Sequence, residues 1–147
     1  MGTRADYYIG NDPATMEWIG SHAYDGYALH EGDHDEYDAA IAQATTAKGF
    51  RKAVQRMLQT LNHATFPDQG WPWSWDDSQL TDYAYCFVGH EILCYQFGHG
   101  PRHIGEPFCN DEGDGWGDKA PFQDMSARKN VTLGKRSGLM ILRVDGT

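Results

Sequence analysis

The sequence lacks the segments that would send it to a membrane or out of the cell. No apolar run approaches the ~20 residues of a membrane-spanning helix. The first six residues lack the apolar core of a secretory signal, and Gly2 is not followed by the serine or threonine of a myristoylation motif. We therefore expect a cytoplasmic protein with no membrane partner.

Cysteine is scarce, and the count is odd: the chain has three, Cys86, Cys94 and Cys109. A secreted domain of this size more often has an even number, joined in disulfides. We predict free thiols in a reducing compartment. Cys86 and Cys94 fall in expected strands, where cysteine is a small buried hydrophobe, so Cys109 is the thiol that we expect to be exposed.

Motifs for catalysis and for metal binding are missing as well. There is no Gly-x-Ser-x-Gly nucleophile elbow. Two histidine pairs have the i, i+4 spacing that can hold zinc on a helix, His30 with His34 and His99 with His103. Gly32 and Pro101 lie inside these pairs and argue against helices there. We therefore expect no metal, no cofactor and no catalytic residue.

Residues 110–118 place oxygen side chains at positions 1, 3, 5 and 9 of a calcium loop, with glycine at position 6. Pro121 occupies position 12, where the bidentate glutamate belongs. We interpret the segment as an acidic loop rather than as a calcium site.

Negative charge dominates the sequence, with a formal net charge of −9. Residues 128–147 contain five basic groups and one acidic group, so the other 127 residues, with seven basic and twenty acidic groups, carry −13. Such a field repels nucleic acid and attracts basic proteins, including basic grooves that normally hold nucleic acid. The ordinary alternative is that the charge keeps the protein soluble.

The patterns predict one α+β domain over residues 1–147, with a mainly antiparallel sheet backed by one or two helices. The clearest helix is 48–62, where Phe50, Val54, Leu58 and Leu61 recur at helical period. The other expected elements are a helix capped by Asp35, strands at 5–10 and 16–20, a hairpin of 83–88 with 92–97, a long loop at 98–121 and a central strand at 137–144.

The segment Trp71-Pro72-Trp73-Ser74-Trp75 is the strongest candidate binding surface. In an extended chain the three indoles would project to one side, where they could anchor a partner or stack on a ligand, with Asp76 and Asp77 beside them. The alternative is that the rings form a lid over the helix 48–62. Because three indoles are too large for the interior of so small a domain, we expect at least one to stay partly exposed.

Two charged clusters are further candidates. Asp33, Asp35 and Glu36 belong to a wholly polar stretch that could present carboxylates to a basic partner. Lys135, Arg136 and Ser137 form a basic turn that could hold a phosphate through two cations, a hydroxyl and backbone N–H groups.

Five segments share a pattern across most of the chain: MGTRADYY (1–8), EWIGS (17–21), GWPWSWDDS (70–78), TDYAY (81–85) and KNVTLGKRSG (129–138). Together they resemble a family of small proteins encoded by bacteriophages and prophages. The resemblance implies no activity and no site residues. What it implies is a phage accessory protein made in a bacterial cytoplasm.

From this context we expect a protein that acts by binding, as an inhibitor of a host defence system or host enzyme, because inhibition needs a complementary surface rather than a catalytic centre. Two alternatives stay open. The first is a small protein that binds, sequesters or hydrolyses a nucleotide, with Lys135 and Arg136 on the phosphate and the tryptophans on the base. The second is a minor virion or assembly protein.

Overall fold

The computed structural model describes residues 3–10, 16–32, 35–97, 99–106 and 125. Several predictions fall outside these residues and stay predictions. They concern Asp33, His34, Cys109, the acidic loop 110–118, the strand 137–144 and the basic turn of Lys135, Arg136 and Ser137.

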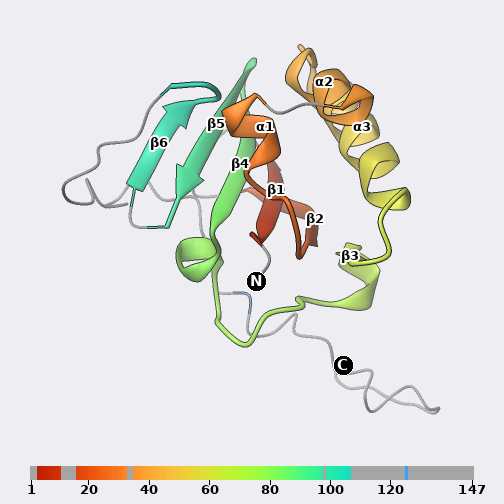
Figure 1. Ribbon diagram of the computed structural model, residues 1–147, viewed down its shortest axis with the longest axis vertical. Coiled ribbons are helices and arrows are strands. Elements are labelled where there is room, and N and C mark those ends of the chain that lie inside the picture. The colour runs from red at the N-terminus through yellow and green to blue at the C-terminus, as the bar shows by residue number, and fades with distance from the viewer. Residues whose placement is uncertain (1–2, 11–15, 33–34, 98, 107–124, 126–147) are drawn as a thin grey trace.

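A six-stranded sheet forms the centre of the fold, in the order β3-β2-β1-β4-β5-β6 (Figure 1). Its strands are β1 (Ala5–Gly10), β2 (Glu17–His22), β3 (Ala64–Thr65), β4 (Tyr83–Val88), β5 (Glu91–Gln96) and β6 (His99–His103). Only the central pair, β1 and β4, is parallel; every other pair of neighbours is antiparallel. The prediction of an α+β fold with a mainly antiparallel sheet is confirmed, as are the strand pair β1–β2 and the hairpin β4–β5.

The prediction of a loop from residue 98 onwards is wrong for the strand β6. His99–His103 pairs antiparallel with β5 at the end of the sheet. Its glycine and proline are typical of a loop. An edge strand, however, uses the backbone N–H groups of only one side for pairing, so Pro101, which lacks an N–H, is tolerated there.

Three α-helices, α1 (Ala28–Glu31), α2 (Glu36–Ala42) and α3 (Ala47–Gln59), lie between β2 and β3 in the chain. Asp35 caps α2 as predicted, and Thr46 caps α3 by accepting the N–H of Gly49. His30 lies in the short α1, which ends at Glu31 with Gly32 as its C-cap in the left-handed region. The helix therefore does not continue through Gly32, and His34 of the predicted pair lies outside the described residues. Within the described ranges, no helix is long and apolar enough to cross a membrane.

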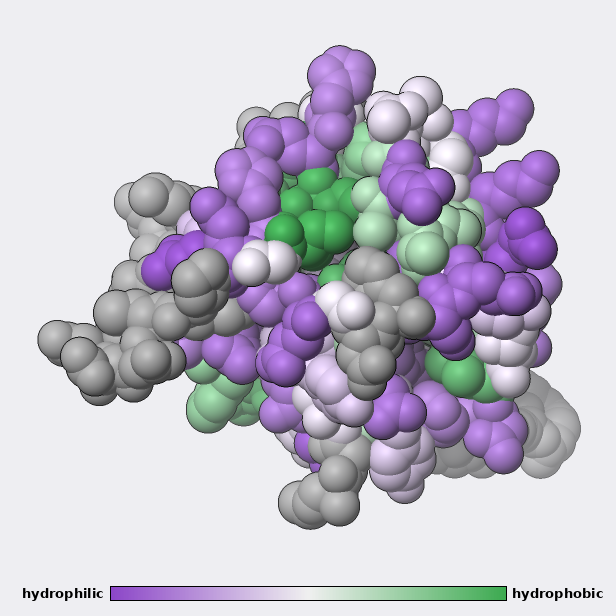
Figure 2. All heavy atoms as spheres, turned by 45° about the horizontal axis from the view of Figure 1, so that its top comes forward, coloured by the Kyte–Doolittle hydropathy of each residue, from purple (hydrophilic) through white to green (hydrophobic). Residues whose placement is uncertain are grey.

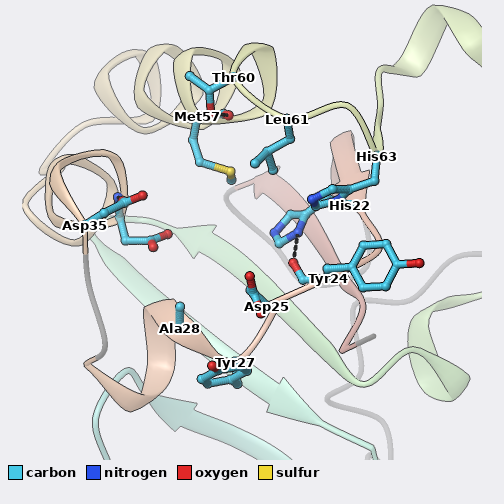
Figure 3. A pocket seen from close by; sticks show the side chains of 11 residues that line it. His22, Tyr24, Asp25, Tyr27, Ala28, Asp35, Met57, Thr60, Leu61 and His63 are labelled. Atoms are coloured by element: carbon cyan, nitrogen blue, oxygen red, sulfur yellow. Dashed lines mark hydrogen bonds between the residues drawn. The ribbon is translucent and has the colours of Figure 1, made fainter. Parts of the chain in front are cut away.

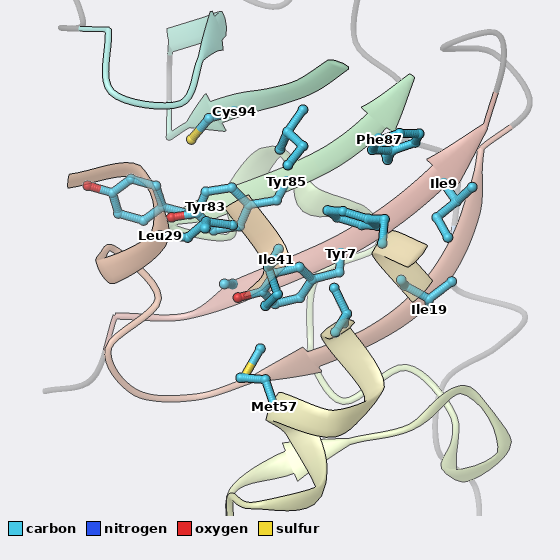
Figure 4. Packing of buried hydrophobic residues seen from close by; sticks show 14 of the residues in the cluster. Tyr7, Ile9, Ile19, Leu29, Ile41, Met57, Tyr83, Tyr85, Phe87 and Cys94 are labelled. Atoms are coloured by element: carbon cyan, nitrogen blue, oxygen red, sulfur yellow. The ribbon is translucent and has the colours of Figure 1, made fainter. Parts of the chain in front are cut away.

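The helices pack on one face of the sheet (Figure 4). Phe50, Val54 and Leu58 of α3 are fully buried against side chains of β1, β2 and β4, and the rings of Phe50 and Phe87 lie 5.2 Å apart. Leu58 packs directly on Gly20, where an added Cβ would lie 2.5 Å from Leu58 Cδ1. The predicted helix 48–62 therefore backs the sheet as expected, although it ends at Gln59.

The opposite face of the sheet is covered by the chain between β3 and β4. This segment includes two 3-10 turns, η2 (Pro67–Gln69) and η3 (Ser78–Leu80), with the tryptophan segment between them. Alternate residues of the central strands, Tyr8 of β1 and Ala84 and Cys86 of β4, pack here with Trp18, Trp71, Tyr95 and Met125. The sheet is therefore buried on both faces, by helices on one and by aromatic side chains on the other.

Candidate binding site

A pocket of about 180 Å³ opens on the helical side, where the end of β2 meets the loop 23–27, the start of α2 and the end of α3 (Figure 3). The loop is fixed by Gly26, whose N–H donates to the Thr3 carbonyl (2.8 Å) and whose carbonyl accepts from the Tyr85 hydroxyl (2.5 Å). A Cβ at Gly26 would lie 2.8 Å from backbone atoms of Thr3 and Arg4, so this close approach requires glycine. The loop therefore presents its side chains from a fixed backbone.

His22 forms the inner wall of the pocket and is almost fully buried. Its Nδ1 lies 2.8 Å from the Tyr24 carbonyl, which can only accept, so Nδ1 carries the proton. Nε2 then accepts from the Tyr7 hydroxyl at 2.9 Å. Burial lowers the pKa of His22 to about 4. At neutral pH this imidazole is uncharged and both of its nitrogens are hydrogen-bonded.

His63 lies beside His22, with ring centroids 5.8 Å apart. Its Nδ1 accepts the backbone N–H of Ala23 at 3.3 Å, so in the neutral ring the proton is on Nε2. The Tyr24 ring meets His63 edge-on at 5.0 Å and is half-exposed at the rim. Aromatic rings therefore make up one side of the pocket.

Three carboxylates line the remaining polar side. Asp35 and Asp38 come from the start of α2, and Asp25 comes from the loop, lying between Asp35 and His22 (Figure 3). Both capping bonds to Asp35, from the N–H groups of Tyr37 (2.9 Å) and Asp38 (3.0 Å), end on Oδ1. Among the described residues that line the pocket, none is lysine or arginine, so its field is negative.

The predicted acidic cluster is only partly brought together. Asp35 lines the pocket, whereas Glu36 is exposed beside it and lines a separate depression that includes Arg56. Sequence analysis missed His22, His63 and Asp25, and it included Asp38 only as part of the acidic stretch 31–38. Two signals in the sequence bear on them: the dipeptide Asp25-Gly26 indicates a turn, and Asp38 follows the helix cap Asp35 by three residues.

Comparison with known protein families, with curated proteins and with solved structures finds no match for this chain. Its function must therefore be inferred from the chemistry of its own residues.

The tryptophan segment lies on the face of the sheet opposite to the helices. Trp71 is buried, with its ring edge-on to Trp18 at 5.2 Å and its Nε1 donating to the Trp75 carbonyl at 2.6 Å. Trp73 and Trp75 are partly buried and stacked at 5.6 Å, with the Arg4 guanidinium 5.7 and 5.4 Å from their centroids. The lid expected over helix 48–62 is wrong, because these rings cover the other side of the sheet. Two indoles remain partly exposed, as expected.

Asp6 holds this segment in place from beneath. Its fully buried carboxylate accepts hydrogen bonds from Ser21 (2.5 Å), Ser78 (2.6 Å) and the Trp73 indole (2.7 Å). Burial raises the pKa of Asp6, and these hydrogen bonds act in the opposite direction. Fully buried, this carboxylate serves as an internal acceptor that fixes the segment.

Asp76 and Asp77 take part in the local structure of the segment. The Asp77 carboxylate caps η3, accepting from the Gln79 N–H at 2.9 Å, and the Asp76 carbonyl accepts from the Met125 N–H at 2.5 Å. Since the tryptophan segment and the acidic pocket lie on opposite faces of the sheet, the structure separates the two groups of candidate residues.

No group of three or more histidine, cysteine or acidic side chains in the described part of the chain is arranged to hold a metal ion. The residues that line the pocket include no cysteine or serine, and the Tyr7 phenol behind His22 is buried. With three carboxylates and no lysine or arginine in its described lining, the pocket can accept a positively charged group.

Proposed function

We propose that this protein acts by binding, and that the acidic side formed by Asp25, Asp35, Glu36 and Asp38 engages a basic surface of a partner protein. The observation that carries the proposal is the convergence of three carboxylates, from two separate elements, on one pocket without a lysine or arginine in its lining. Carboxylates arranged in this way steer and orient a basic partner.

The hydropathy of the surface supports charge as the recognition principle. Among the coloured residues, the face shown in Figure 2 is hydrophilic over most of its area, with apolar residues gathered near its centre. A partner that docks on such a surface would be selected by charge around its apolar residues, which add contact area.

The resemblance to phage proteins suggests which class of protein the partner belongs to. In a bacterial host, the proteins that present basic surfaces include those whose grooves bind nucleic acid, and defence systems depend on such grooves. We propose that the chain is an anti-defence accessory protein that occupies a basic surface of a host defence protein or host enzyme.

The test begins with affinity capture from a bacterial lysate at 0.1 M salt and continues with the purified partner. Neutralising the site in the triple variant Asp35→Asn, Glu36→Gln and Asp38→Asn should weaken binding on the order of tenfold. Asparagine also caps helices, so α2 should persist. Binding should also weaken towards 1 M salt, where the Debye length falls from ~10 Å to ~3 Å.

The matched control is the triple variant Asp68→Asn, Glu91→Gln and Glu106→Gln, which changes net charge by the same +3, from −9 to −6, at exposed positions away from the pocket. If both triple variants weaken binding by the same factor, overall charge is responsible and the proposed surface is wrong. If the ligand is instead a nucleotide, neither triple variant should change binding, while Lys135→Ala and Arg136→Ala should abolish it.

A further inference from the structure

The pocket is too small for most small-molecule ligands. Its volume of about 180 Å³ lies below the ~300–1,000 Å³ that is usual for small-molecule sites. A cavity of this size has room for the end of one side chain, and its carboxylates would repel a phosphate or a carboxylate. The occupant should therefore be a single basic side chain of a larger molecule.

The distribution of apolar and polar atoms matches a long basic side chain. Met57 reaches into the pocket from the last turn of α3 and Leu61 from just after it, and the Asp25 carboxylate faces them from the loop (Figure 3). Lysine and arginine have the same division, with a methylene stem that packs on apolar surface and a charged head that needs polar partners.

His22 provides ring surface rather than charge, because burial lowers its pKa to about 4, and the His63 ring lies beside it. His22 donates from Nδ1 and accepts at Nε2 within the fold, so it has no free nitrogen for a ligand. His63 Nδ1 is occupied by the Ala23 N–H. A cation that enters the pocket would therefore meet aromatic surface on the histidine side and carboxylates on the other.

We infer that this pocket receives the guanidinium group of an arginine side chain presented by the partner. This inference rests on the proposed function and identifies the side chain that anchors the partner. A guanidinium is planar and stacks on aromatic rings, and its five donors can reach several carboxylates at once, here Asp25 from the loop and Asp35 and Asp38 from the start of α2. It is also more weakly hydrated than an ammonium group, which favours its entry into a partly apolar cavity.

The experiment uses N-acetyl-arginine methylamide as the probe and N-acetyl-lysine methylamide for comparison, each titrated into the full chain and followed by ¹H–¹⁵N NMR. We expect arginine amide to shift the resonances of His63, Asp25 and Asp38, and lysine amide to bind about fivefold more weakly. Asp25→Asn or Asp38→Asn should each weaken arginine binding by a similar factor. Asp68→Asn, an exposed change outside the pocket, should leave it unchanged.

The possible outcomes separate this inference from the proposed function. If lysine amide binds as well as arginine amide, or the shifts lie elsewhere, the arginine site is refuted. The proposed function still stands in that case if the Asp35→Asn, Glu36→Gln and Asp38→Asn triple variant binds the captured partner more weakly. If arginine amide binds the pocket but the same triple variant binds the captured partner as tightly as the wild type does, the arginine site stands and the proposed function fails. If both measurements are negative, both are wrong.

Discussion

The two faces of the sheet are buried by different means, although the same strands supply both. Along β1, Tyr7 and Ile9 point to the helical face, whereas Asp6 and Tyr8 point to the tryptophan face. The helical face is filled mainly with aliphatic and aromatic carbon that packs against α2 and α3, with the buried, hydrogen-bonded His22 as a titratable group. The tryptophan face is organised around a buried carboxylate, with hydroxyl and indole groups donating to it.

This difference matters because the two kinds of burial respond to different perturbations. Packing of carbon against carbon is non-directional and depends on volume, so it is sensitive to cavities. A buried hydrogen-bond network depends on direction and on protonation, so it is sensitive to pH and to the loss of single donors or acceptors. The predictions below test whether the two faces behave in these separate ways.

The largest effect should come from a cavity on the helical face. Leu58 of α3 is fully buried and packs on Gly20 of β2. Leu58→Ala should therefore lower the free energy of unfolding by ~2–5 kcal/mol. Chemical denaturation at neutral pH measures the loss. The matched control is Gln55→Ala, on the exposed side of the same helix, which should change stability by less than ~0.5 kcal/mol. A loss below half a kcal/mol for Leu58→Ala would mean that α3 does not back the sheet.

The next largest effect is a pH dependence in which the two faces act in opposite directions. His22, on the helical face, has a folded pKa of about 4, below its ordinary 6.5. The unfolded chain therefore binds this proton more readily, and stability is lost as pH falls from 6.5 towards 4, by roughly 3 kcal/mol in total. Asp6, on the tryptophan face, has a raised pKa. Its protonation in the folded state favours folding as pH falls through that folded pKa towards the unfolded value of 3.8.

Urea denaturation at several values of pH between 7 and 4 separates the two groups. His22→Gln should lose less stability over this range than the wild type, because the neutral imidazole no longer has to charge on unfolding. Asp6→Asn should lose more, because the opposing contribution is removed. Parallel pH profiles for the wild type and His22→Gln would show that His22 is not held neutral by the fold.

The helical face could be predicted from the sequence because its signal is local. The period of Phe50, Val54 and Leu58 fixes the helix and its buried side, and Asp35 and Thr46 lie where caps are expected. The tryptophan face could not be predicted in this way. Asp6 and Ser78 are 72 residues apart in sequence, and a carboxylate within an apolar strand does not indicate which donors will surround it.

The acidic pocket shows the same limit. Asp35 could be identified as part of a polar stretch, but the pocket also depends on His22 at the end of β2 and His63 after α3, which meet only because β2 pairs with β3. Nothing in the spacing of these two histidines indicates that contact. Sequence patterns therefore predicted β1, β2, α2, α3, the hairpin β4–β5 and one side chain of the site, while the pairing of strands determined its remaining walls.

The smallest expected effect is a difference in thiol labelling between the faces. The register pairs Cys86 with Leu93 and Tyr85 with Cys94, so the two cysteines are offset by one residue and point to opposite sides of the sheet. A cross-link between them is therefore not possible in the folded state, and both are free, as predicted. Burial raises the pKa of both thiols, so neither should react quickly with iodoacetamide in the native protein.

Labelling at low denaturant concentration, followed by mass spectrometry of peptides, compares how the faces open. If the sheet and both of its coverings unfold together, Cys86 under the tryptophan segment and Cys94 under the helices should be labelled at rates within about twofold of each other. Much faster labelling of Cys86 alone would mean that the tryptophan segment detaches while the helical face stays folded. In that case Asp6 and its donors would hold a separately opening unit, and the hydrogen-bonded face would be the weaker of the two.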